Sequence, residues 1–162
     1  MSDHALDISL TVNGERVNER VEARKTLVDF LREDLSLTGS HVGCEQGGCG
    51  ACTVRVNGDV VRGCLMLAVQ CDGATVETIE GLSDSGEVAD LQAAFEQRNA
   101  LQCGYCTPGM LAAAQDLLKQ GGVPGRDAIR VHLSGNYCLC TGYHAIVDAV
   151  EAVAKSRAGA KS

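Results

Sequence analysis

The sequence predicts an α+β fold, in which a half built on a β-sheet precedes a half made of four short helices. Apolar residues alternate with a period of two up to Ile79 and recur with a period near four beyond Glu87. Glycine and serine residues between Glu80 and Glu87 indicate a linker at this change. A chain of 162 residues has room for two small domains, so we expect them at 1–81 and 82–162.

The first half is expected to open with a β-hairpin over residues 7–21. Apolar side chains alternate along it and Asn13-Gly14 is a two-residue turn signal. A helix should follow, with Thr26 as its N-cap and Gly39 as its end. Its apolar face is formed by Leu27, Phe30, Leu31 and Leu35.

A second hairpin is predicted around Asn57-Gly58, between strands at 53–56 and 60–62. Pairing across this turn places residue 64 opposite residue 51, so Cys64 should return beside Cys52. The extended run 74–79 adds a further strand. This half should therefore be a small sheet with one covering helix.

Helical spacing of apolar residues marks the second half. Residues 155–162 are polar and small, and we expect a frayed tail there. The four apolar faces are Val88, Leu91 and Phe95; Met110, Leu111, Ala114, Leu117 and Leu118; Ile129 and Leu133; and Ile146, Val150 and Val153. Together they predict a small helical bundle.

Composition and charge exclude two classes of partner. The chain has 14 basic and 21 acidic residues, a net charge of -7, whereas binding to a phosphate backbone needs clustered lysine and arginine. The longest apolar run, Cys64 to Val69, is too short to span a membrane. Because Met1 to His4 carry no basic segment followed by an apolar core, we expect a cytoplasmic protein.

Nine cysteines in a reducing compartment indicate metal binding or redox chemistry, because structural disulfides are disfavoured there. The first set, Cys44, Cys49, Cys52 and Cys64, begins with the Cys-x4-Cys-x2-Cys spacing of plant-type [2Fe-2S] proteins. Seven glycines between residues 39 and 63 allow backbone N–H groups to turn toward cluster sulfurs. A structural zinc site is the alternative, although zinc knuckles normally use shorter, symmetric spacings.

The second set, Cys103, Cys106, Cys138 and Cys140, is expected between helices. Thr107-Pro108 and Thr141-Gly142 follow the two pairs, so both pairs should lie at helix N-termini. Alone, Cys103-x2-Cys106 also fits a thioredoxin-like pair or half a zinc site. Two complete sets of four nevertheless favour two [2Fe-2S] clusters.

The remaining candidates indicate no substrate chemistry in this chain. Cys71 follows an apolar stretch and is expected to be a buried free thiol rather than a ligand. The histidines at 4, 41, 132 and 144 form no metal-binding pair at helical spacing, and no paired carboxylates or hydrolase motif is present. We therefore assign no catalytic residue and no role to His41 or His144.

Three motifs, found in order, carry a resemblance to a known family. They are GCEQGGCGACTV at 43–54, LQCGYCTPG at 101–109 and GNYCLCTGY at 135–143. In these motifs the chain resembles the small iron-sulfur subunit of the molybdenum hydroxylases, which include xanthine dehydrogenase, aldehyde oxidoreductase and aerobic CO dehydrogenase. The resemblance extends from Asn13-Gly14 to about Ala154 and implies a β-grasp ferredoxin-like domain followed by a four-helix-bundle [2Fe-2S] domain.

The resemblance also implies partners. Electrons would pass from a molybdopterin cofactor in a large subunit, through the helical and then the ferredoxin-like cluster, to FAD in a medium subunit. Gln102 and Cys140 match positions that approach the pterin. Two such heterotrimers are often paired. Leu139 departs from the family, which often has arginine between these cysteines, and this removes any ion pair made by that arginine.

The function expected from the sequence is that of an electron-transfer subunit in a heteromeric molybdenum-containing oxidoreductase. A free-standing ferredoxin-like carrier that docks transiently on reductases is the alternative. In the first case the substrate is chosen in the large subunit, so this sequence leaves its identity open.

Overall fold

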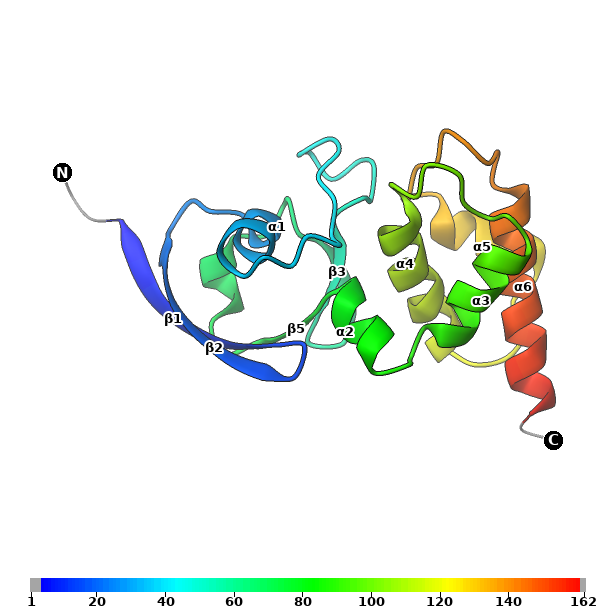
Figure 1. Cartoon of the computed structure of the whole chain (residues 1–162), viewed down its shortest axis with the longest axis horizontal. Coiled ribbons are helices and arrows are strands. Elements are labelled where there is room, and N and C mark those ends of the chain that lie inside the picture. Colours follow the sequence, from blue (N-terminus) through cyan, green and yellow to red (C-terminus); the bar gives the residue numbers. More distant parts are fainter. Residues whose placement is uncertain (1–3, 161–162) are drawn as a thin grey trace.

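The computed structural model describes residues 4–160, so the expectation of no leader at Met1 to Asp3 falls on residues outside it. A sheet half and a helical half lie side by side, and the two ends of the chain are at opposite ends of the molecule (Figure 1). The described residues form a five-stranded sheet and helices α1–α6, which confirms the predicted α+β class. Within them, every helix falls short of the length and apolar character needed to cross a membrane.

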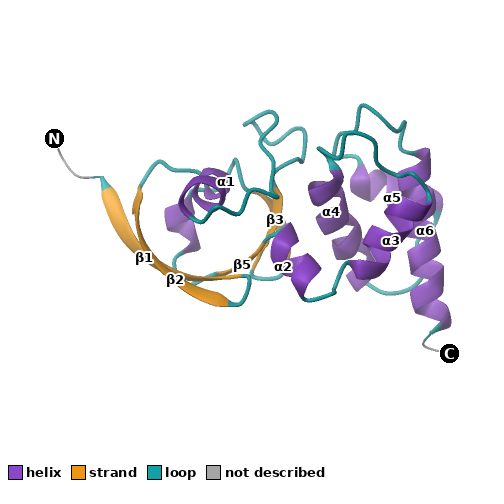
Figure 2. Ribbon diagram, viewed as in Figure 1, coloured by secondary structure: helices purple, strands orange, loops and turns teal. Residues whose placement is uncertain are grey.

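The sheet has the strand order β2-β1-β5-β3-β4. Its labelled strands lie in the half of the molecule opposite helices α3–α6 (Figure 2). Both predicted hairpins are confirmed, since β1 pairs with β2 and β3 pairs with β4 in antiparallel fashion. β5 runs parallel to β1 and antiparallel to β3, and so joins the two hairpins. The strand bounds are β1 Ala5–Val12, β2 Glu15–Glu22, β3 Thr53–Val56, β4 Asp59–Arg62 and β5 Thr75–Glu77.

One helical segment covers the sheet, as predicted, but it is shorter than expected. Thr26 caps it, because the Thr26 hydroxyl accepts the N–H of Asp29 at 3.2 Å. Helix α1, Leu27–Asp29, continues into the π-helical turn η1, Phe30–Asp34. There the Leu35 N–H donates to the Phe30 carbonyl at 3.2 Å, and the segment ends well before Gly39.

The predicted linker at 80–87 is wrong in its first part. Helix α2, Ile79–Asp84, occupies it, and Leu82 is buried in a small apolar cluster that includes Ala112 of the helical half. Burial of this apolar side chain outweighs the low helix propensity of Gly81. The division at 81/82 stays a prediction, because packing continues across it.

The predicted helical faces form the core of the second half, where most buried residues of the four helices belong to one cluster. Val88, predicted on the first face, instead precedes its helix and is buried with Leu82 and Ala112. The helices are α3 Ala89–Gln97, α4 Thr107–Lys119, α5 Arg126–Leu133 and α6 His144–Gly159. The tail prediction is wrong from Lys155 to Gly159, which are helical, while Lys161 and Ser162 lie outside the described residues. An ion pair at 2.7 Å between Arg157 and Asp90 of α3 holds this last turn in place.

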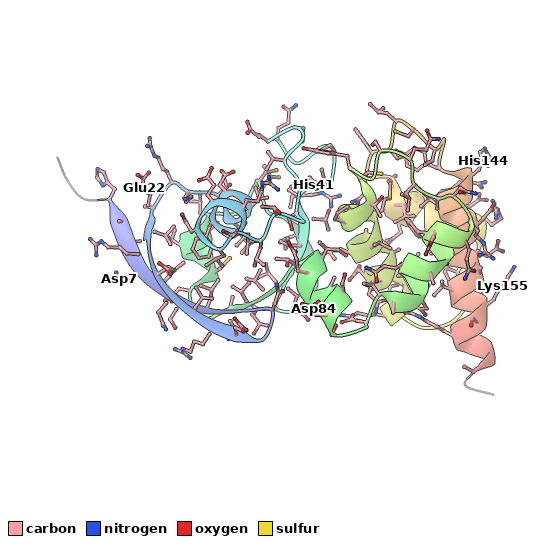
Figure 3. All side chains as sticks on the ribbon, viewed as in Figure 1. Asp7, Glu22, His41, Asp84, His144 and Lys155 are labelled. Carbon is pink, nitrogen blue, oxygen red and sulfur yellow. The ribbon has the colours of Figure 1, made fainter. Side chains whose placement is uncertain are left out.

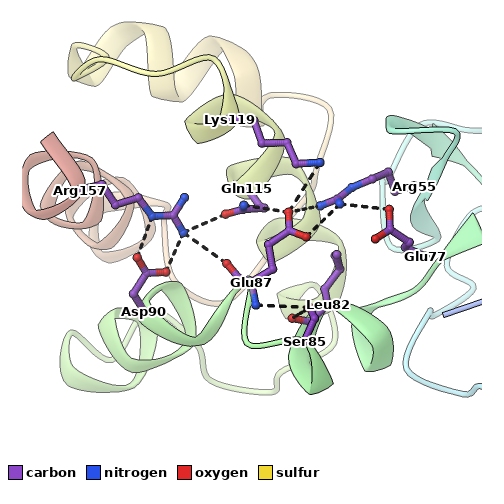
Figure 4. Close-up of polar contacts among 9 residues, drawn as sticks. All are labelled: Arg55, Glu77, Leu82, Ser85, Glu87, Asp90, Gln115, Lys119 and Arg157. Carbon is purple, nitrogen blue, oxygen red and sulfur yellow. Dashed lines mark hydrogen bonds and ion pairs between the residues drawn. The ribbon is translucent and has the colours of Figure 1, made fainter. Parts of the chain in front are cut away.

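A polar network joins the two halves (Figure 4). Glu87 accepts two hydrogen bonds from the Arg55 guanidinium, at 2.6 and 3.1 Å, and one from Gln115 of α4 at 2.9 Å. Arg55 comes from β3, and its side chain is only 4 % exposed. Since Arg55 also pairs with Glu77 of β5, the sheet and the helical half are tied through charged groups.

Candidate metal centres

The first cysteine loop surrounds a thiol with backbone donors. Cys44 Sγ accepts the N–H of Cys49 at 3.3 Å. Hydrogen bonds from the backbone N–H groups of Gln46 and Cys49 lower the pKa of Cys44 to about 7. Gly47 has φ +78°, a conformation that glycine adopts at little cost. The loop therefore stabilises negative charge on sulfur, as a thiolate-bound cluster requires.

The predicted return of Cys64 beside Cys52 is confirmed. The β3–β4 register pairs Thr53 with Arg62, and the Gly63 N–H donates to the Cys52 carbonyl at 3.1 Å. Burial, together with the side chain of the neighbouring Cys64, raises the pKa of the Cys52 thiol to about 11, although a backbone hydrogen bond from Cys64 acts to lower it. The hairpin thus brings the last cysteine of the first set against the third.

The second set is assembled from two loops of the helical half. The Sγ atoms of Cys140 and Cys103 lie 3.5 Å apart. Burial and the neighbouring Cys138 raise the pKa of Cys106 to about 12. The pKa of Cys138 is lowered instead: burial acts to raise it, but hydrogen bonds from the Thr141 hydroxyl, at 3.2 Å, and from nearby backbone N–H groups outweigh that effect.

The helix N-terminus prediction is confirmed for one pair and wrong for the other. Cys106 is the N-cap residue of α4. Cys140 stands four residues before α6, whose N-cap residue is Tyr143. The side chain of Tyr143 folds back, and its hydroxyl accepts the N–H of Cys138 at 2.8 Å. A tyrosine side chain therefore orients this pair, where a helix dipole was expected.

A cavity of about 260 Å³ lies between Cys49 of the first set and the four cysteines of the second. The Tyr137 N–H donates to the Cys49 carbonyl at 2.8 Å, a direct link between the two cysteine loops. The cavity is lined by Gly43, Cys49 and Ala51 of the first loop and by Cys103, Tyr105, Cys106, Tyr137, Cys138, Leu139 and Cys140 of the helical half. Thiols from both sets thus border a shared space.

The structure also places the other predicted site residues. Gln102 and Cys140 meet, since Gln102 Nε2 donates to the Cys140 carbonyl at 2.8 Å. Leu139, between Cys138 and Cys140, is 100 % exposed. Cys71 is fully buried in the sheet core, which confirms that it packs as an apolar residue.

The two histidines without an assigned role lie in different halves (Figure 3). His41 lies by the first loop and stacks on Tyr105 of the second, with ring centroids 4.5 Å apart. His41 Nδ1 also lies 2.8 Å from the Tyr105 carbonyl oxygen. His144 begins α6. His41 therefore contributes to the contact between the halves.

Sequence reasoning missed a buried polar cluster between the cysteine loops. Asn136 is 2 % exposed, and its Nδ2 donates to the Gly50 carbonyl at 3.1 Å and to the Thr53 hydroxyl at 3.2 Å. Arg62 donates to the Thr53 hydroxyl, to the Gly135 carbonyl and to Asn136 Oδ1. Asn136 and Gly50 are 86 positions apart in the sequence, so no local sequence pattern predicts their contact.

The donor set fits dinuclear iron-sulfur clusters. Each such cluster is held by four thiolates, two on each iron, and each of the two sets offers four free thiols. Among residues 4–160, no three histidine, cysteine or acidic side chains converge on one point as ligands of a single ion. A [2Fe-2S] cluster does not need such a point, because its donors are shared between two irons.

Comparisons with known proteins agree with this chemistry. A family model described as "2Fe-2S iron-sulfur cluster binding domain" matches residues 10–74, and one described as "[2Fe-2S] binding domain" matches residues 78–151. Caffeine dehydrogenase subunit gamma of Pseudomonas sp. (strain CBB1) is 46 % identical over all of this chain and 98 % of its own length. The small subunit of nicotine 6-hydroxylase from Paenarthrobacter nicotinovorans is 50 % identical over 90 % of this chain and 87 % of its own.

A solved structure of quinoline 2-oxidoreductase from Pseudomonas putida 86 contains a similar chain, with a TM-score of 0.90 and 46 % identity over 98 % of both chains. Identity of 46 % over nearly the full length of both chains indicates a common family as well as a common fold. The chain belongs to the family of small iron-sulfur subunits of the molybdenum hydroxylases.

Proposed function

We propose that the two sets of cysteines hold the two [2Fe-2S] clusters of this electron-transfer subunit. Each cluster, when bound, accepts and releases one electron. In the first site, backbone N–H groups turned toward Cys44 offset the negative charge of the thiolates. In the second, Thr141 and nearby backbone N–H groups do the same for Cys138. The proposed ligands are Cys44, Cys49, Cys52 and Cys64 for the first cluster, and Cys103, Cys106, Cys138 and Cys140 for the second.

The observation that carries this proposal is the contact between the two cysteine loops: Cys49 and all four cysteines of the second set line one cavity, and the Cys49 carbonyl accepts the Tyr137 N–H. An electron-transfer subunit needs its two redox centres close together. An isolated thioredoxin-like pair or a structural zinc site would not need a second cysteine set beside it. The first loop also leaves no room for a side chain at Gly43, because a Cβ there would lie 3.0 Å from Cys49 Sγ. The residues of this chain therefore hold the two proposed centres close to each other.

The helical half is proposed to form a four-helix domain that faces the molybdopterin-binding subunit. Large apolar side chains are exposed around the second cysteine set, where a soluble monomer gains nothing from them. They are Leu101, Tyr105, Tyr137 and Leu139. Gln102, beside Cys140, is proposed to contact the pterin from this face. The ferredoxin-like domain would then serve the FAD subunit or another acceptor.

The wider assembly is proposed as a cytoplasmic dimer of heterotrimers of large, medium and small subunits. Two of the relatives are named as acting on caffeine and nicotine, and the solved structure on quinoline. All three substrates contain an aromatic nitrogen heterocycle. We propose the same class for the complex that contains this chain.

Metal analysis tests the ligand proposal. The purified chain should contain four irons and four acid-labile sulfides, and its reduced form should give two distinct EPR signals. One zinc in a colourless sample would contradict the proposal. Co-purification with molybdenum- and FAD-containing subunits from native cells separates the complex subunit from a free-standing carrier, which would elute alone.

A further inference from the structure

Arg62 lies at the junction of the two cysteine loops. Its Nη2 donates to the Gly135 carbonyl at 2.8 Å and to Asn136 Oδ1 at 3.2 Å, and its Nη1 donates to the Thr53 hydroxyl. The contact with Gly135 is tight, since a Cβ there would lie 2.7 Å from Nη2. The guanidinium of β4 is therefore fixed against the helical half.

All these acceptors are neutral. Within residues 4–160, no carboxylate forms an ion pair with Arg62. Arg55, by contrast, pairs with two carboxylates, and Arg157 pairs with Asp90. A partly buried cation without a counter-ion is costly unless other negative charge lies nearby. Arg62 thus carries a positive charge for which residues 4–160 supply no carboxylate partner.

The position of Arg62 relative to the cysteines suggests what that partner is. Arg62 is two residues before Cys64, and Asn136 is two residues before Cys138. Two residues span at most about 7 Å of backbone. Thr53, which also bonds Arg62, follows Cys52 directly. The guanidinium therefore contacts residues that lie within three positions of Cys52 in the first set and of Cys138 in the second.

We propose that Arg62 is a positioning residue that places a permanent positive charge between the two clusters and raises their reduction potentials. This inference rests on the ligand sets proposed above. A [2Fe-2S] cluster with four thiolates is negatively charged and gains one further negative charge on reduction, so a fixed cation stabilises the reduced form more. Arg62 thereby makes both centres easier to reduce and holds their loops together.

The test is a redox titration of the iron-loaded protein, followed by EPR. Arg62→Gln removes the charge and keeps a hydrogen-bond donor. It should shift the equilibrium of each cluster toward the oxidised form by roughly tenfold, or 59 mV for a one-electron couple. Arg24→Gln is the matched control, because it removes the same charge from a side chain that is 89 % exposed. It should leave both potentials unchanged.

Arg62→Lys keeps the charge and loses the forked donor geometry. For each cluster, the equilibrium constant for reduction should therefore stay within about twofold of the wild-type value. An iron-loaded Gln variant with unchanged potentials overturns the inference. If the Gln variant loses iron, the Lys variant decides, since a tenfold shift with the charge retained overturns it as well. Wild-type protein without iron would instead overturn the ligand proposal.

Discussion

The backbone N–H of Tyr137 donates to the carbonyl oxygen of Cys49 at 2.8 Å, and this bond connects the two cysteine loops without any side chain. Tyr137 directly precedes Cys138, so the bond joins a residue of the first set to the neighbour of one in the second. The length of this hydrogen bond depends on how closely the sheet half approaches the helical half. Gly50 and Gly109 allow that approach, because neither has a Cβ to collide with the facing backbone.

The first prediction concerns Gly109 of α4. A Cβ at this position would collide with the carbonyl oxygen of Gly50. Gly109→Ala should therefore push the loops apart and destabilise the iron-loaded protein by about 1–3 kcal/mol. The magnetic interaction between the two reduced clusters, measured by EPR, should weaken too.

Gly159→Ala is the matched control for that experiment. Gly159 also lies in a helix, and nothing stands within 4 Å of an added Cβ. This variant should be neutral or slightly stabilised, because alanine favours helix over glycine. Equal stability of the Gly109→Ala protein and the wild type would show that the loops have room to separate.

The second prediction concerns Glu87 in the polar network that joins the two halves. Arg55 holds the pKa of Glu87 at about 2, well below its ordinary value of 4.5. Glu87→Gln should therefore lower the free energy of unfolding by about 2 kcal/mol at pH 7, because the buried Arg55 loses one of its two carboxylates. Denaturant unfolding of both proteins measures this difference.

The pH dependence of that difference follows from the direction of the shift. A carboxyl group with a lowered pKa in the folded state contributes its full stability above the pKa of the unfolded chain, near 4.5. The contribution is lost as the pH falls from there toward 2. The gap between wild type and Glu87→Gln should be constant from pH 8 to pH 6 and shrink below pH 4.5. A gap that widens on acidification would contradict the assignment.

The sequence predicted the cysteine sets because ligand spacing is a local property. The turn at Asn57-Gly58 sets the register that carries Cys64 back to Cys52, and both are close in sequence. Contacts between the halves have no such signal. Arg62 and Asn136 are 74 positions apart, and each looks like an ordinary polar residue in its own segment.

Two segments were misjudged for the same reason. Glycine and serine content favoured a linker where α2 forms, because the burial of Leu82 against the helical half is a tertiary effect. The polar end of α6 looked frayed, yet Arg157 reaches Asp90, 67 positions away. Local composition indicates only the intrinsic propensity of a segment. Contacts with residues distant in the sequence stabilise both of these helical segments.

The third prediction separates the ninth cysteine from the proposed ligands. Cys71 is fully buried, and burial raises the pKa of its thiol to about 11, so it stays neutral at pH 7. Cys71→Ala should retain four irons and lose about 1–2 kcal/mol of stability through a small cavity. Cys64→Ala, the comparison variant, should lose the irons of the first cluster. Iron loss in Cys71→Ala would make Cys71 a ligand.

The fourth prediction concerns Gln102, which bonds the Cys140 carbonyl at 2.8 Å on the face proposed to meet the large subunit. Gln102→Ala should leave the iron content unchanged and slow reduction of the clusters by substrate roughly threefold to tenfold, the effect of one lost hydrogen bond. Stopped-flow spectroscopy of the assembled complex measures this rate. Gln120→Ala, at the far end of α4, is the matched control and should reduce at the wild-type rate. If both variants are slowed equally, the loss reflects assembly of the complex, and Gln102 has no special place near the pterin.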